Sequence, residues 1–306
     1  MARQIKGAGA RLEYLAFAAA KGILAALPLR VAMRIGTALG TIAMKADRVN
    51  RPIAMRNLEI AFPDADLAAR LGILRGMYQN WGRMAAEWSH FAEINRDNID
   101  RFAVYDDLEY LEYLKRTIDG CGILCLTGHF GNFELMAAAH SLNGFPTAIV
   151  QRPLRNPLMD QAINASRMRF GGRIIARKGV GRQILGLLRS NCLVAFALDL
   201  DVRKGVFVDF FGRKACTSDG LARLAMVTGV PVVPAFIVRQ GDTASHRIRI
   251  LPPVEIVTSG DRAQAVTENT QRFTTILEGI IRRHPDHWNW IHRRWKTRPP
   301  GEKRFY

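Results

Sequence analysis

From about residue 105 onward, the sequence alternates short apolar runs with longer stretches of helical character. This alternation predicts an α/β domain with a mostly parallel sheet that is covered by helices on both faces. In sheets of this kind, active sites gather at the carboxyl ends of the strands. The expected strands are residues 122–127, 147–150, 173–176, 193–198, 206–211, 230–238 and 247–251. Helices are expected between most of these strands, for example at residues 156–170, 179–190 and 218–228.

One expected strand end carries the motif Gly-His-Phe-Gly-Asn-Phe-Glu, residues 128–134, just before a helix-like stretch. Glu134 is expected in the first turn of that helix, where the helix dipole favours a carboxylate. We expect Glu134 to hold one ring nitrogen of His129 and to leave the other free to accept a proton. The helix start also offers backbone N–H groups to an oxyanion or an acidic head group. The competing interpretation is a buried histidine that is bonded to a backbone carbonyl.

Positive charge is concentrated at the two ends of the chain. The net charge at pH 7 is +17, from 44 Lys and Arg against 27 Asp and Glu. Residues 1–56 carry a net +8 and residues 282–306 a net +6, whereas the rest of the chain carries only +3. Basic ends bind nucleic acid, an anionic membrane surface or an acidic partner protein. Trp288, Trp290 and Trp295 lie among the basic residues of the second end, a pattern typical of a membrane interface or a nucleic-acid platform.

The amino-terminal stretch of residues 12–46 is apolar and helix-forming, but Glu13, Lys21, Arg30 and Arg34 interrupt it. No uncharged run in it approaches the roughly 20 residues that a clean membrane span requires. We expect residues 1–46 to be a membrane-associated helical segment, which either enters the membrane with snorkelling charges or lies in its interface. Residues 47–306 are then the catalytic domain. The alternative is an ordinary amphipathic helix packed on that domain.

Two features of the sequence bear on metal binding. The four cysteines form no C-x-x-C pair, so we expect neither a zinc site nor redox chemistry, but buried thiols in a reducing cytoplasm. Asp199 and Asp201 form a D-x-D pattern like that of metal-dependent glycosyltransferases. Because side chains alternate along a strand, both carboxylates are expected on one face, which suits either a metal ion or basic groups of a ligand.

Several blocks of the sequence carry a resemblance to a known family, in matching order and spacing over roughly residues 10–300. The blocks are RNLEIAFPD (56–64), GHFGNFE (128–134), QRPLRNPLMD (151–160), RMRFGG (167–172), the long block 197–239 and PDHWNWIHRRWKTRP (285–299). Through them the sequence resembles the late acyltransferases of lipid A biosynthesis, the lauroyl/myristoyl transferase family. These enzymes are similar to the glycerolipid acyltransferases that use a His-x4-Asp/Glu motif. One departure is Phe133, where many members carry Trp.

The resemblance implies a glycerolipid-acyltransferase-like fold and an O-acyltransferase activity without a metal or cofactor. The acyl group is expected to move from acyl carrier protein to a hydroxyacyl chain of a lipid A precursor, at the cytoplasmic face of the inner membrane. His129 is expected to deprotonate the acceptor hydroxyl while Glu134 orients the ring. Arg152 is expected to contact a phosphate or the developing negative charge. The full set of expected substrate-binding residues is Arg152, Asn132, Asp199, Asp201 and Arg203.

Two alternatives to lipid A acylation remain at this point. The nearest is an acyltransferase that acts on another envelope lipid, such as a lysophospholipid or a glycolipid. The more distant alternative is a basic nucleic-acid-binding protein, which the net charge of +17 would explain. Against it, the basic residues do not form a known nucleic-acid-reading motif, and the motif at residues 128–134 would have no task. Nucleic acid is therefore not expected among the partners.

Overall fold

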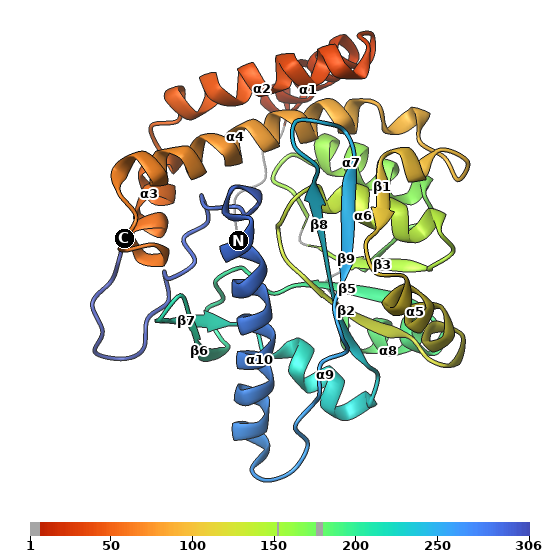
Figure 1. The fold of residues 1–306 in the computed structure, drawn as a ribbon, viewed down its shortest axis with the longest axis vertical. Helices are drawn as coiled ribbons and strands as arrows, with labels where there is room; N and C mark the ends of the chain where they lie inside the picture. Colours follow the sequence, from red (N-terminus) through yellow and green to blue (C-terminus); the bar gives the residue numbers. More distant parts are fainter. Residues whose placement is uncertain (1–6, 152, 176–179) are drawn as a thin grey trace.

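The centre of the molecule is a sheet with strand order β1-β9-β8-β2-β5-β3-β4 in the computed structural model, which describes residues 7–151, 153–175 and 180–306. Neighbouring strands of this sheet run parallel except β8 and β9, which are antiparallel (Figure 1). The strands are β1 (Ala103–Tyr105), β2 (Ile123–Thr127), β3 (Thr147–Val150), β4 (Arg173–Ile175), β5 (Leu193–Ala197), β8 (Val232–Arg239) and β9 (His246–Ile250). The prediction of a mostly parallel α/β sheet is confirmed.

The central strand β2 shows why both faces of the sheet are covered. Its five residues are all buried, and successive side chains point to opposite faces. Ile123 and Cys125 join a hydrophobic cluster with residues of helices α5 (Leu108–Gly120) and α6 (Phe133–Leu142). Leu124 and Leu126 join another with residues of α8 (Val180–Arg189), α9 (Gly220–Thr228) and α10 (Arg262–Arg283). A continuous apolar run is therefore what a strand with helices on both sides requires.

Polar caps fix where several of these helices begin. The side chains of Asp107, Asn132, Asn156 and Asp261 accept backbone N–H groups at the starts of α5, α6, α7 (Pro157–Arg169) and α10. Such caps satisfy N–H groups that have no partner inside the helix. The helices expected at 156–170, 179–190 and 218–228 correspond to α7, α8 and α9 within two residues at each end among the described positions.

A separate antiparallel hairpin follows β5. It consists of β6 (Val206–Phe210) and β7 (Arg213–Thr217), joined by Phe211 and Gly212 at φ values of 53° and 70°. Two positive φ values are what a tight hairpin turn requires. The strand β7 was not predicted, because its sequence, Arg-Lys-Ala-Cys-Thr, begins with two charged residues.

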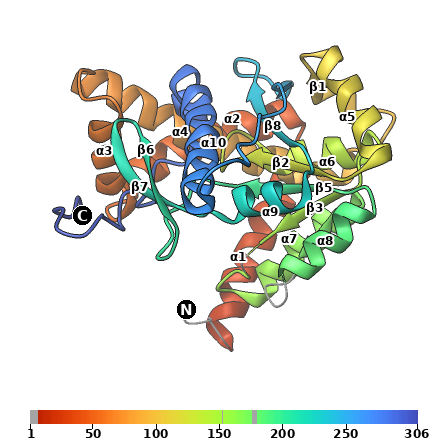
Figure 2. The same cartoon turned by 90° about the horizontal axis from the view of Figure 1, so that it is seen from below.

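Four helices precede the sheet: α1 (Ala8–Ala25), α2 (Leu29–Ala46), α3 (Asn50–Ala61) and α4 (Leu67–Ser89). Figure 1 shows α2 and α4 side by side across one end of the molecule. Their backbones touch at Gly36, Gly40 and Gly82, since a Cβ added to Gly36 would lie 2.3 Å from the carbonyl oxygen of Gly82. Figure 2 shows α1 leaving this pair and running beside α7. No helix within the described ranges is long and apolar enough to cross a membrane.

Three short 3₁₀ helices complete the described elements: η1 (Phe91–Glu93), η2 (Ile99–Arg101) and η3 (Pro285–His287). The chain after η3 folds back onto the body of the protein. Trp288, Trp290 and Trp295 have no exposed surface and pack with Phe130 and Phe210 in one cluster. The sequence-based interpretations of these tryptophans, as a membrane interface or a nucleic-acid platform, are therefore wrong for their rings. An indole this deep contributes core packing instead.

Candidate active site

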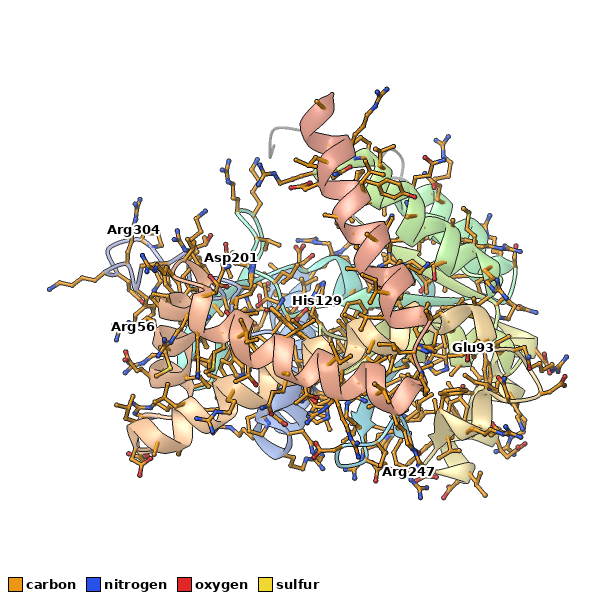
Figure 3. The ribbon with its side chains drawn as sticks, turned by 90° about the horizontal axis from the view of Figure 1, so that it is seen from above. Arg56, Glu93, His129, Asp201, Arg247 and Arg304 are labelled. Atoms are coloured by element: carbon orange, nitrogen blue, oxygen red, sulfur yellow. The ribbon has the colours of Figure 1, made fainter. Side chains whose placement is uncertain are left out.

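His129 follows the carboxyl end of β2, and Asp199 follows the carboxyl end of the neighbouring strand β5. The ring Nδ1 of His129 lies 2.9 Å from Asp199 Oδ1, and the backbone N–H of His129 donates to Asp199 Oδ2 at 2.8 Å. Trp288 Nε1 donates to the same Oδ2 at 3.0 Å. Because a carboxylate only accepts, Nδ1 carries the proton and Nε2 carries the lone pair. Figure 3 shows His129 near the middle of the molecule.

His129 and Asp199 each shift the pKa of the other toward the charged form. The Asp199 carboxylate raises the pKa of His129 above 6.5, although burial of the ring opposes the shift. Burial alone would raise the pKa of Asp199, but the His129 charge and the hydrogen bonds from His129 and Trp288 hold it well below its usual range. Asp199 is only 1% exposed, whereas the His129 side chain is 32% exposed. The pair is therefore a buried anion that supports an accessible base.

Glu134 does not orient His129, contrary to the sequence-based prediction. Its Oε2 accepts from Arg167 Nε at 2.9 Å, and its Oε1 accepts from Arg167 Nη2. A guanidinium can donate to both oxygens of a carboxylate at once. Both oxygens of Glu134 are therefore engaged by Arg167. Glu134 does lie in the first turn of α6 as predicted, and its negative charge also raises the pKa of His129. The orienting carboxylate is Asp199, which was predicted to bind substrate instead.

The backbone of the motif is held between β8 and the segment formed by η3 and the residues that follow it. Gly131 has a φ of 56°, and a Cβ on it would lie 2.1 Å from the carbonyl oxygen of Ile237. The Gly131 N–H donates to the carbonyl of His287 at 2.8 Å, and the carbonyl of His129 accepts from Asn289 N–H at 3.2 Å. Only glycine fits this combination of positive φ and close contact.

The first residue of α6 lies four residues after His129, and the start of this helix presents backbone N–H groups. Asn132 caps the helix, with its Oδ1 accepting from Leu135 N–H at 3.1 Å. Its Nδ2 donates to Glu87 Oε2 at 2.7 Å, and the residue is buried. Both polar atoms of the Asn132 side chain are therefore bonded within the protein, and its role in substrate binding stays a prediction. Within the described part of the chain, the N–H groups of Phe133 and Glu134 have no acceptor. Such groups, at a positive helix end, are ready donors to an oxyanion.

Asp201 and Arg203, also predicted to bind substrate, lie in other surroundings. Asp201 accepts from the backbone N–H and the hydroxyl of Thr297 at 3.0 and 2.9 Å, so it fastens the carboxyl-terminal segment. Asp199 and Asp201 therefore have different partners and do not act as a D-x-D pair. Arg203 is exposed in the turn before β6. Arg152 lies outside the described residues.

Across residues 7–151, 153–175 and 180–306, no group of three or more His, Cys, Asp or Glu side chains is placed to hold a metal ion. The cysteines are free thiols, with Cys125, Cys192 and Cys216 buried and Cys121 partly buried. The prediction of buried core thiols is thus confirmed for three of them.

Two residues of the site were missed by the sequence analysis, Arg167 and Trp288. Arg167 begins the block RMRFGG, and Trp288 lies in the block PDHWNWIHRRWKTRP, so both stood within the quoted resemblance. Neither position has a periodicity or a spacing that would mark it. Their roles depend on contacts with Glu134 and Asp199, which lie 33 and 89 residues away.

Comparisons with known proteins show the family of the chain. Residues 10–297 match the model of the bacterial lipid A biosynthesis acyltransferases. The lipid A biosynthesis palmitoleoyltransferase of Escherichia coli K12 is 31% identical over 284 residues, which cover 92% of this chain and 90% of that protein. The lipid A biosynthesis lauroyltransferase of the same organism is 29% identical over an alignment that covers 90% of this chain and 88% of that protein. The lipid A biosynthesis myristoyltransferase of this organism is 27% identical, over 96% of this chain and 89% of that protein. The chain therefore belongs to the bacterial lipid A biosynthesis acyltransferase family.

Proposed function

We propose that this O-acyltransferase moves a fatty acyl group from an acyl carrier protein thioester to a hydroxyl of a lipid A precursor, with His129 as general base. One observation carries the proposal: His129 is held by a buried carboxylate on Nδ1, while Nε2 has no hydrogen-bond partner among the described residues. An oriented ring with one accessible lone pair is the arrangement that general-base catalysis requires. Membership of the family supports lipid A as the acceptor.

The reaction follows from the positions of these groups. His129 Nε2 takes the proton from the acceptor hydroxyl as its oxygen attacks the thioester carbonyl carbon. The oxyanion that forms accepts from the free N–H groups of Phe133 and Glu134 at the start of α6. When it collapses, the carbon–sulfur bond breaks, and the departing thiolate takes the proton from His129. The products are an ester and a free carrier thiol. Asp199 remains ionised throughout and stabilises the protonated ring.

Glu134 and Arg167 contribute through their charges and positions. Each side chain is 14% exposed, and they form an ion pair beside the start of α6. The Glu134 charge raises the pKa of His129, and the Arg167 charge lowers it. Because the two effects oppose, the pair changes the basicity of His129 less than Asp199 does. Its main contribution in this mechanism is to fix the first turn of α6 against α7.

We further propose that the protein binds the cytoplasmic face of the inner membrane through α1 and α2. These helices expose large apolar side chains at Leu12, Leu15, Ile23, Val31, Ile35, Leu39 and Ile42. Basic residues accompany them at Arg11, Lys21, Arg30, Arg34 and Lys45. Apolar and basic side chains on one pair of helices are typical of a segment that lies in the interface of an anionic membrane. This arrangement favours lying on the membrane over spanning it.

Mass spectrometry of lipid A from cells that lack the protein tests the function directly. We expect one secondary acyl chain to be missing, and fragmentation then gives the donor length and the acylated hydroxyl. Complementation with the wild-type protein should restore the chain, whereas complementation with His129→Ala should not. Unchanged lipid A together with a change in another envelope lipid would favour the alternative acceptor instead.

A further inference from the structure

The long helix α4 buries a polar stripe. Asn80, Arg83 and Glu87 lie three and four residues apart, on one face of the helix, and all three are buried. A helix normally turns apolar side chains toward the core, and charged residues are rarely buried unless they are paired. Packing of α4 against the core therefore does not explain why these three polar side chains are buried.

Glu87 is the most completely bonded residue of this stripe. Its side chain is 4% exposed, and both of its oxygens accept from the Arg239 guanidinium. Its Oε2 also accepts from Asn132 Nδ2 at 2.7 Å. Asn132 is the cap of α6, three residues after His129. A side chain of α4 is thus bonded directly to Asn132, the residue that caps α6.

The Glu87 carboxylate fixes which way the Asn132 amide faces. Since a carboxylate only accepts, it selects the amide nitrogen and turns the amide oxygen toward Leu135 N–H, which is the capping bond. Without the carboxylate, the Leu135 N–H bond alone would hold this orientation, and the Asn132 side chain would lose its bond to α4. Loss of that bond would loosen the first turn of α6 relative to α4, where the free N–H groups of Phe133 and Glu134 lie.

Arg239 links the same carboxylate to the other side of the motif. Its backbone N–H donates to His287 Nε2 at 3.1 Å, and the His287 carbonyl accepts from Gly131 N–H at 2.8 Å. Gly131 is therefore held through His287, and Asn132 through Glu87, with Arg239 common to both. The motif residues between His129 and α6 are fixed by groups that lie outside the motif.

We propose that Glu87, together with Arg239, is a positioning residue that sets the N–H groups at the start of α6 relative to His129. This inference rests on the proposed function, because it assigns those N–H groups to the oxyanion. Misplacement of such donors by about 1 Å costs roughly 10²-fold in rate. Loss of Glu87 and Arg239 would therefore lower turnover rather than substrate binding. The hydrogen bond between His129 and Asp199 would stay intact.

The test uses two variants that break the link by different means. In Glu87→Met/Arg239→Met both charges are replaced by apolar side chains, an exchange that is often neutral for stability at a buried ion pair. In Asn132→Ser the hydroxyl still caps α6 but is too short to reach Glu87. Ser89→Ala is the matched control, because Ser89 is a buried polar residue of α4 that bonds to Ala86 and His90 and not to α6.

For both link variants we expect kcat per folded enzyme to fall by roughly 10²-fold, with KM and the midpoint of the pH–rate profile unchanged. The control should keep the wild-type kcat. Wild-type kcat in either link variant, once folded, would overturn the inference. So would a loss of activity that only follows the folded fraction, a rise in KM alone, or a shifted pH midpoint. His129→Ala, assayed in parallel, tests the proposed function separately, because its outcome does not depend on Glu87.

Discussion

Two carboxylates lie near His129, one at the end of β5 and one at the start of α6, and they differ in what surrounds them. Asp199 is buried and receives bonds from the His129 ring, the His129 backbone and the Trp288 indole. Glu134 is partly exposed, and Arg167 occupies both of its oxygens. The carboxylate that is 70 residues away in the sequence is therefore the partner of the base, and the one that is five residues away is not.

The difference between the two carboxylates indicates which of them controls the basicity of His129. Asp199 is hydrogen-bonded directly to the His129 ring, and it is the largest cause of the raised pKa of His129, although the buried Arg294 guanidinium also interacts with its charge. Glu134 has no hydrogen bond to His129, and its charge is offset by its ion pair with Arg167. Because a charge in direct contact acts more strongly than one engaged by another partner, loss of Asp199 should affect the base more than loss of Glu134.

The largest effect is expected when the base itself is removed. His129→Ala should lower turnover by roughly 10²–10⁴, the usual range for a lost general base. The ring is 32% exposed, so we expect the variant to stay folded. Steady-state acyl transfer with a purified carrier-protein donor measures the change, and circular dichroism and thermal unfolding check the fold. Near-normal turnover in a folded variant would contradict the mechanism.

A smaller but still large effect is expected for Asp199→Asn. The amide keeps the shape of the side chain but loses the charge, and its NH₂ group faces donors where a carboxylate oxygen accepted. We expect turnover to fall by roughly 10²-fold through misorientation of the ring and a weaker base. Glu134→Gln provides the comparison in the same assay and should fall by about 10-fold or less. An equal or larger loss for Glu134→Gln would reverse the ranking of the two carboxylates.

The pH–rate profile sharpens the same comparison. The base must be neutral to act, so activity rises as the pH increases through the pKa of His129. Since Asp199 raises that pKa, the acid limb of wild-type kcat/KM should lie above pH 6.5. In Asp199→Asn the limb should move to lower pH, and in Glu134→Gln it should move in the same direction by less. A limb that stays in place in Asp199→Asn would show that the titrating group is not His129 or that Asp199 does not control it.

The smallest effect on chemistry is expected from the amino-terminal helices. Replacing Leu12, Ile23, Ile35 and Leu39 with Gln should release much of the protein from anionic vesicles, with activity on a detergent-dispersed acceptor nearly unchanged. Substitution is preferable to deletion of residues 1–46, because α2 is packed directly on α4. Val227→Gln, at an exposed apolar residue of α9, is the control and should leave binding intact. Full vesicle binding by the four-residue variant would show that α1 and α2 are not the membrane surface.

The parts of the fold that were predicted are those in which the local sequence carries the physical requirement. β2 is continuously apolar because it is covered on both faces, and α7 begins at the cap Asn156 before Pro157. The parts that were missed depend on contacts between distant segments. β7 carries charged residues and is paired only with β6. Trp288 is buried because Phe130, Phe210 and Asp199 surround it, which its basic neighbours in the sequence do not indicate.

The site residues also divide into one that the local sequence predicted and others that depend on distant contacts. His129 was predicted because the end of an apolar strand and the following glycines mark its position. Its partner was assigned wrongly because the order of the strands in the sheet is not encoded in the spacing of the motif. Once β2 pairs with β5, Thr127 lies beside Ala197, and Asp199 follows two residues later. Glu134 was the nearest carboxylate along the chain, and Arg167, 33 residues further on, occupies it.

The most direct measurement of the central claim is the pKa of the His129 ring by NMR, with histidine carrying ring labels. The signal is assigned by its absence in His129→Gln, and the titration is then repeated in Asp199→Asn and Glu134→Gln. We predict a pKa above 6.5 in the wild-type protein, a large decrease in Asp199→Asn and a small decrease in Glu134→Gln. A wild-type pKa at or below 6.5, or a larger decrease in Glu134→Gln than in Asp199→Asn, would contradict the account.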